Sequence, residues 1–191
     1  MYETSNTAEL TRKINIQQGK TSQTPKVLKE TLFSIDTRPI NSITSAIKNG
    51  GYSFVTHCIE HDHNKSFSKL SPDAQGTKRI YFLPVSEKVF IGQEDHYAKK
   101  FGFKICEYAR NYLLGLIADT PKDRMPPELK GKMLVAAENQ IYQYGTFTSS
   151  IFSVRCHENG DRELIGWICP ASFRWNSKDD EPKMFLVEKI A

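Results

Sequence analysis

Large apolar side chains recur every three or four residues in the stretch from Gln93 to Asp119. They are Tyr97, Phe101, Ile105, Tyr108, Tyr112 and Leu116. On a helix these positions fall within an arc of roughly 100°, the width of the stripe that an amphipathic helix buries. Glu94 and Asp95 come in the first turn, where negative charge meets the positive end of the helix dipole. The pattern predicts a central helix over residues 93–118.

A second helical pattern follows the proline-rich connection at residues 120–127. Pro126 and Pro127 suit the start of a helix, and Gly145 suits its end. The apolar positions between them are Leu129, Met133, Leu134, Ala137, Ile141 and Tyr144. We therefore predict a second helix over residues 127–144.

The segments on either side of these helices have the patterns of strands, apart from one short helix and from residues 25–35. In that segment Val27, Leu28, Leu32 and Ile35 fit a helix, but residues 31–35 also fit a strand. Asn41-Ser42 can cap the short helix, and Gly50-Gly51 can end it. Alternation or short apolar runs predict strands at residues 52–59, 78–83, 88–91, 150–156, 163–168 and 183–190. Asn159-Gly160 is the turn signal of a hairpin between two of them, and the runs at 78–83 and 88–91 could form another. Strands that flank a helical centre predict an α+β fold with a mostly antiparallel sheet.

The chain of 191 residues has the length of one domain with a proper core. Residues 1–24 are rich in Thr, Ser, Gln and Asn and carry few large apolar residues. Such a segment cannot bury enough surface to offset its ordering entropy. We expect a flexible N-terminal tail over residues 1–24 and a single α+β domain over residues 25–191.

The composition indicates a soluble protein outside the secretory route. No apolar run approaches the roughly 20 residues that span a bilayer, and the N-terminus lacks an apolar signal core. The four cysteines form no CxxC pair and suit reduced thiols packed in a core. We expect a cytoplasmic location and no membrane partner. The formal net charge of +4 favours polyanionic partners only weakly.

Basic and aromatic residues alternate on the back of the predicted central helix and near the C-terminus. The candidate nucleic-acid-binding residues are Lys99, Lys100, Phe103, Lys104, Arg110, Arg174 and Trp175. Lysine and arginine neutralise phosphates, and an aromatic ring can stack on a base. In the alternative interpretation, Phe103 and Leu114 pack against a second layer, and Lys104, Glu107 and Arg110 form a solvated charge ladder.

The densest group of metal-ligating side chains is His57, Cys58, His61 and His63. Zinc takes imidazole and thiolate ligands, and a second pair could come from Cys156 or His157 with Cys169. The spacing matches no standard zinc pattern. The alternative is an exposed polar turn after a strand, with Cys58 in the core. A histidine- or metal-dependent hydrolase or nuclease centred on His57, His61 and His63 is the corresponding enzymatic hypothesis.

The sequence has no GxxxxGK[ST], GxGxxG or HExxH motif, which argues against a nucleotide-dependent enzyme of a common kind. Our leading hypothesis is a small binding protein without catalytic activity or cofactor. It would act on DNA, RNA or a nucleoprotein assembly. A protein-interaction module, such as a complex subunit or an inhibitor, is the alternative that needs neither nucleic acid nor metal.

Overall fold

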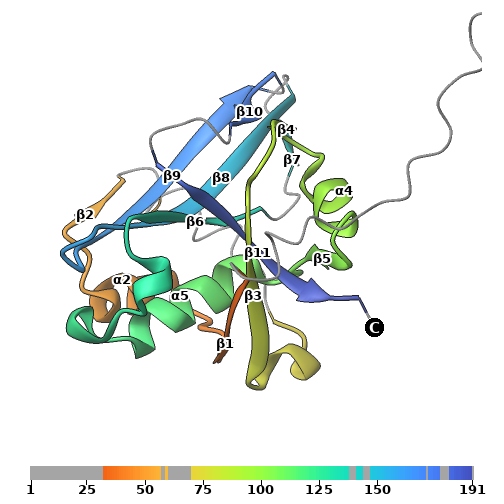
Figure 1. Ribbon diagram of the computed structural model, residues 1–191. Coiled ribbons are helices and arrows are strands. Elements are labelled where there is room, and N and C mark those ends of the chain that lie inside the picture. Colours follow the sequence, from red (N-terminus) through yellow and green to blue (C-terminus); the bar gives the residue numbers. More distant parts are fainter. Residues whose placement is uncertain are drawn as a thin grey trace, which may run out of the picture.

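The computed structural model describes residues 32–56, 59, 70–137, 141–143, 147–170, 172–176 and 181–190. They form an α+β domain around one large, strongly curved sheet (Figure 1), as the strand patterns predict. The predicted tail at residues 1–24 lies outside the described residues. Within the described part, no helix is long and apolar enough to cross a membrane.

The sheet runs in the order β1-β3-β11-β6-β8-β9-β2, with β5 paired to β11 and β7 paired to β8. Only β11–β6 and β2–β9 are parallel among the described pairs, so the sheet is mostly antiparallel as predicted. Two short strands, β4 and β10, form a separate ribbon. The strands are β1 Phe33–Thr37, β2 Phe54–Val55, β3 Lys78–Pro84, β4 Val89–Phe90, β5 Phe103–Ile105, β6 Lys132–Ala136, β7 Ile141–Gln143, β8 Phe147–Cys156, β9 Arg162–Pro170, β10 Arg174–Trp175 and β11 Lys183–Lys189.

The two central strands, β6 and β11, are buried on both faces of the sheet. Successive strand side chains point to opposite faces, so Met184 and Leu186 join one apolar cluster while Phe185 and Val187 join the other. We call these faces the α5 side and the α4 side, after the helices that cover them.

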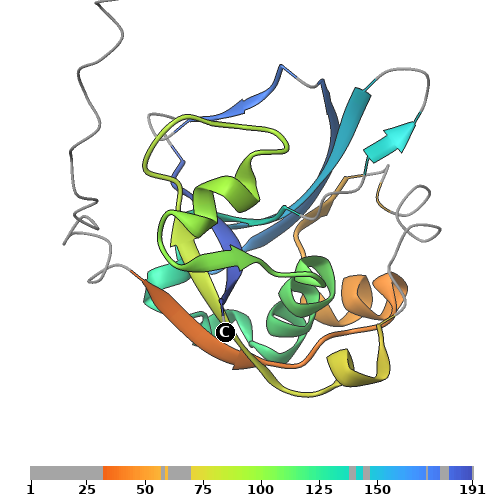
Figure 2. The same cartoon turned by 90° about the vertical axis from the view of Figure 1, so that its right-hand side faces the viewer.

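The α5 side is covered by α5 (Ala109–Asp119) and α2 (Ile43–Gly50), which lie side by side in Figure 2. The predicted cap of α2 is confirmed, because the Ser42 hydroxyl accepts a 3.2 Å hydrogen bond from the Ser45 amide and the helix ends before left-handed Gly51. Gly115 allows α5 to approach the preceding chain, since a Cβ there would lie 1.7 Å from the Arg38 carbonyl oxygen.

The α4 side is covered by α4 (Glu94–Lys99) and the β4–β10 ribbon. Short 3₁₀ turns complete the connections. They are η2 Pro72–Gln75, η3 Lys122–Arg124 and η4 Pro127–Leu129.

The predicted central helix over residues 93–118 is wrong in extent. Residues 93–119 instead form α4, β5 and α5 in succession. Gly102 ends the turn after α4 with a φ of 82°. Residues that have a Cβ rarely adopt this left-handed backbone conformation. The apolar stripe is shared between the two clusters, because Tyr97 packs on the α4 side and Tyr112 on the α5 side.

The predicted second helix over residues 127–144 is also wrong. Its first residues form η4, and the chain then turns at Gly131 (φ 66°) into strands β6 and β7. A strand that is buried on both faces carries apolar residues at successive positions. Adjacent apolar residues such as Met133 and Leu134 therefore occur in such a strand as well as on the buried side of a helix.

Of the two hairpins predicted from the sequence, one is present in the structure and the other is not. The hairpin joined by Asn159-Gly160 is confirmed, with Val154 opposite Leu164 in the β8–β9 register. The proposed pairing of residues 78–83 with 88–91 is wrong, because β3 pairs with β1 and β11 while β4 pairs with β10.

Candidate nucleic-acid interface

The β4–β10 ribbon separates an inward pair of side chains from an outward pair. Val89 lies opposite Trp175 in the register, and both are buried in the cluster on the α4 side. Phe90 lies opposite Arg174, and both are exposed. The Arg174 guanidinium carbon lies 4.6 Å from the centroid of the Phe90 ring. The ribbon therefore presents a cation stacked on an aromatic ring.

Trp175 attaches this ribbon to α4. Its indole Nε1 donates a 2.9 Å hydrogen bond to the Glu94 Oε1 in the first turn of the helix. The ring also packs edge-on against Phe173 and Phe185, with centroids 5.2 and 5.6 Å away. The burial that accompanies this contact raises the pKa of Glu94, although the Trp175 hydrogen bond opposes the rise. The hydrogen bond thus joins two segments that are about eighty residues apart in sequence.

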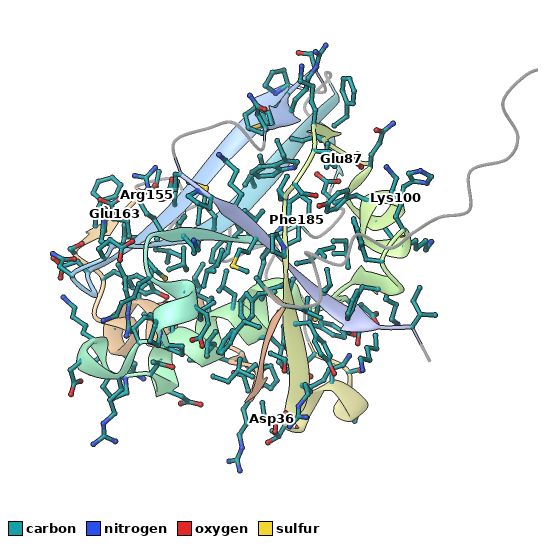
Figure 3. The ribbon with its side chains drawn as sticks, viewed as in Figure 1. Asp36, Glu87, Lys100, Arg155, Glu163 and Phe185 are labelled. Carbon is teal, nitrogen blue, oxygen red and sulfur yellow. The ribbon has the colours of Figure 1, made fainter. Side chains whose placement is uncertain are left out.

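The exposed lysines of α4 are paired with neighbouring carboxylates. Lys99 contacts Asp95 at 2.6 Å, and this hydrogen bond lowers the pKa of the Asp95 carboxyl. Lys100 contacts Glu87 at 2.5 Å. Both side chains are labelled in Figure 3. The loop that carries Glu87 is held in place by Tyr97, whose hydroxyl donates to the Pro84 carbonyl oxygen at 2.6 Å.

Lys104 lies on β5 but faces the α5 side of the sheet, because its neighbours Phe103 and Ile105 pack in the cluster on the α4 side. It is half exposed and lies 3.6 Å from Glu188, which also contacts Lys78. Burial lowers the pKa of Lys78, but the hydrogen bond and negative charge of Glu188 outweigh this effect, so the pKa is raised overall. Glu188 is thereby held between two cations.

Three of the predicted binding residues are in the core, and their predicted contact with a ligand is revised for this reason. Phe103 is 7% exposed, and Arg110 and Trp175 are each 1% exposed. Phe103 packs on Tyr81, and Arg110 lies over the ring of Phe152. Phe103 is buried, as the alternative interpretation has it, but on strand β5 and not on a helix. Arg110 is not part of a solvated ladder.

Two exposed residues near the α4 lysines and Arg174 are not among the residues predicted from the sequence. They are Lys88 and Phe90. Both are exposed, and they flank the inward-facing Val89. The alternation of Lys, Val and Phe at the start of a predicted strand was the available signal. A strand of this length can be buried on either face, so the alternation does not decide which of these side chains are exposed.

The predicted metal ligands His57, Cys58, His61 and His63 lie outside the described residues. Within the described part, no cluster of three or more potential ligands is present. Cys156 and Cys169 cannot form the predicted second pair, because the register places Cys156 opposite Arg162 and Cys169 opposite Ser149, near opposite ends of the hairpin. Burial raises the pKa of the Cys156 thiol to about 12.

Comparisons with protein-family models, with curated proteins and with solved structures find no match to this chain.

Proposed function

We propose that this protein binds nucleic acid through one basic surface, which we call the α4–ribbon surface. It consists of Lys88, Phe90, Lys99, Lys100 and Arg174. The observation that supports the proposal is the Trp175–Glu94 hydrogen bond, which joins the ribbon with the exposed Arg174–Phe90 stack to the first turn of α4. Nucleic-acid binding needs cations for the phosphates and can use exposed aromatic faces for the bases.

The charge balance of this surface supports an anionic ligand. Among the described residues, its cations outnumber the carboxylates that contact them, which are Glu87 and Asp95. Glu94, the remaining acid of α4, turns its carboxylate inward to Trp175. Phosphate groups would therefore meet a net positive field.

The ion pairs of Lys99 and Lys100 do not prevent phosphate binding. Exposed ion pairs contribute only about 0–1 kcal/mol to stability, because water screens the charges and the long side chains lose freedom. A phosphate can therefore displace Asp95 or Glu87 at small cost. The competition predicts modest affinity that depends strongly on salt.

The test is the salt dependence of binding to a labelled oligonucleotide. Each phosphate contact contributes about −0.7 to −0.9 to the slope of log affinity against log salt concentration. We expect the double variant Lys99→Ala/Lys100→Ala to flatten this slope by about one to two units and to weaken binding similarly for all sequences.

The matched control is the double variant Lys48→Ala/Lys122→Ala. These lysines are exposed near α2 and η3, and the Lys122–Asp161 pair at 3.0 Å resembles the Lys100–Glu87 pair. The control should keep the wild-type slope. Equal flattening by both double variants, or no binding of the wild type at low salt, contradicts the proposal.

A further inference from the structure

The Phe90–Arg174 pair has properties that phosphate binding alone does not require. Phe90 is a large apolar side chain that remains 38% exposed, although the adjacent Trp175 and Val89 are buried. Its partner Arg174 lies over the ring and is itself exposed. An exposed aromatic ring with a planar cation on it is a surface on which a flat ring system can stack.

We infer that the Phe90–Arg174 pair is a base-stacking subsite and that the α4–ribbon surface selects single-stranded nucleic acid. This inference rests on the proposed function and names the class of ligand. A base with an accessible face can stack on the guanidinium or on the exposed part of the ring. In a duplex both faces of each internal base are covered by neighbouring base pairs, so the subsite is useful only to an unpaired strand.

The backbone around the pair fixes its position before a ligand arrives. The Ile91 amide donates a 3.2 Å hydrogen bond to the Phe173 carbonyl oxygen, which continues the pairing of β4 with β10. Inward-facing Trp175 anchors the ribbon to the core. Stacking therefore costs little conformational entropy in the protein.

Cations adjacent to the subsite suit the phosphates that flank a stacked base. Lys88 precedes Phe90 by two residues, a separation of roughly 7 Å in extended chain. Lys100 is held near the same loop by its contact with Glu87. The arrangement combines one stacking position with a track of positive charge, which is the usual composition of a sequence-tolerant single-strand site.

The test compares three probes at low salt: an oligothymidine, an abasic strand with the same number of phosphates, and a duplex of the same length. Phe90→Ala should weaken binding of the oligothymidine by about 5- to 100-fold, which corresponds to the loss of one stacked base. Its affinity for the abasic strand and the duplex should stay at the wild-type value. Phe90→Tyr keeps the ring and should restore binding of the oligothymidine.

The two proposals fail in different ways. If the wild type binds all three probes with a steep salt dependence but Phe90→Ala changes their affinities equally or not at all, the stacking subsite is refuted and phosphate binding stands. If the wild type binds none of the probes at low salt, the proposed function fails and the subsite fails with it. Thermal denaturation of both Phe90 variants verifies that the exposed position leaves the fold intact.

Discussion

The two sides of the sheet are covered in very different ways. On the α5 side, all side chains from Ala109 to Ile117 are buried, so the helix is enclosed by the sheet, by α2 and by the neighbouring loops. On the α4 side, a six-residue helix and a ribbon of two two-residue strands cover the sheet and leave Phe90, Lys99 and Arg174 exposed. Both sides bury an apolar cluster, but the thinner cover of the α4 side leaves a cation stacked on an aromatic ring at the surface.

Polar groups follow the same division. On the α5 side Arg162 is buried, and its guanidinium donates to the carbonyl oxygens of Gly50, Ile117 and Thr120 at 3.2, 2.8 and 2.5 Å. One cation therefore caps the C-termini of both α2 and α5, where the helix dipoles are negative. Burial lowers the pKa of Arg162. On the α4 side the cations instead face solvent.

The largest expected effect comes from removing this cap. Arg162→Met keeps much of the side-chain volume but leaves the buried carbonyl oxygens without their donor, at about 1–3 kcal/mol for each unsatisfied group. We expect the free energy of unfolding, measured by urea denaturation, to fall by about 3 kcal/mol or more.

Arg79→Met is the matched control for this change. Arg79 donates two hydrogen bonds to Asp36 at 2.8 and 2.9 Å, but both side chains are exposed. This variant should leave the denaturation midpoint nearly unchanged. Similar losses for both variants would show that burial of the cation does not distinguish the two sides of the sheet.

A smaller effect is expected from Glu94, the buried acid of the α4 side. Its folded-state pKa is raised by burial, so the folded protein binds the proton more tightly than the unfolded chain does. Stability contributed by this group is therefore greatest at acidic pH and decreases as the pH rises through the folded-state pKa. Each unit of pKa difference corresponds to about 1.4 kcal/mol.

Glu94→Gln isolates this effect, because the amide oxygen can still accept the hydrogen bond from Trp175. Relative to the wild type, the variant should gain stability between acidic and neutral pH in urea denaturation. Parallel stability curves for the two proteins over that range would mean that Glu94 has no raised pKa in the folded state.

Local signals in the sequence predicted the elements that depend on local interactions. Helix α2 was identified from Ser42 and the paired glycines, and the β8–β9 hairpin from Asn159-Gly160. The error at the central helix has a tertiary cause. The apolar residues of its stripe are buried or partly buried, but the chain crosses from one side of the sheet to the other at β5. Periodicity alone does not indicate which of the two apolar clusters a residue joins.

The candidate interface was only partly predictable for a related reason. Lys99, Lys100 and Arg174 were identified as exposed cations, and the structure places them on one side of the sheet. Trp175 was mistaken for a stacking residue because composition cannot tell which of two neighbouring strand residues faces inward. That choice is set by the pairing with β4, which is remote in sequence.

The most direct test of the central claim is a titration of isotope-labelled protein with oligothymidine, followed through its backbone amide NMR signals. We predict that the perturbed signals map to residues 88–90, 99–100 and 174, with little change in α2 and α5. Because both sides of the sheet are observed in one experiment, each serves as the control for the other. Perturbations centred on α2 and α5, or none at saturating oligonucleotide, would contradict the assignment of nucleic-acid binding to the α4–ribbon surface.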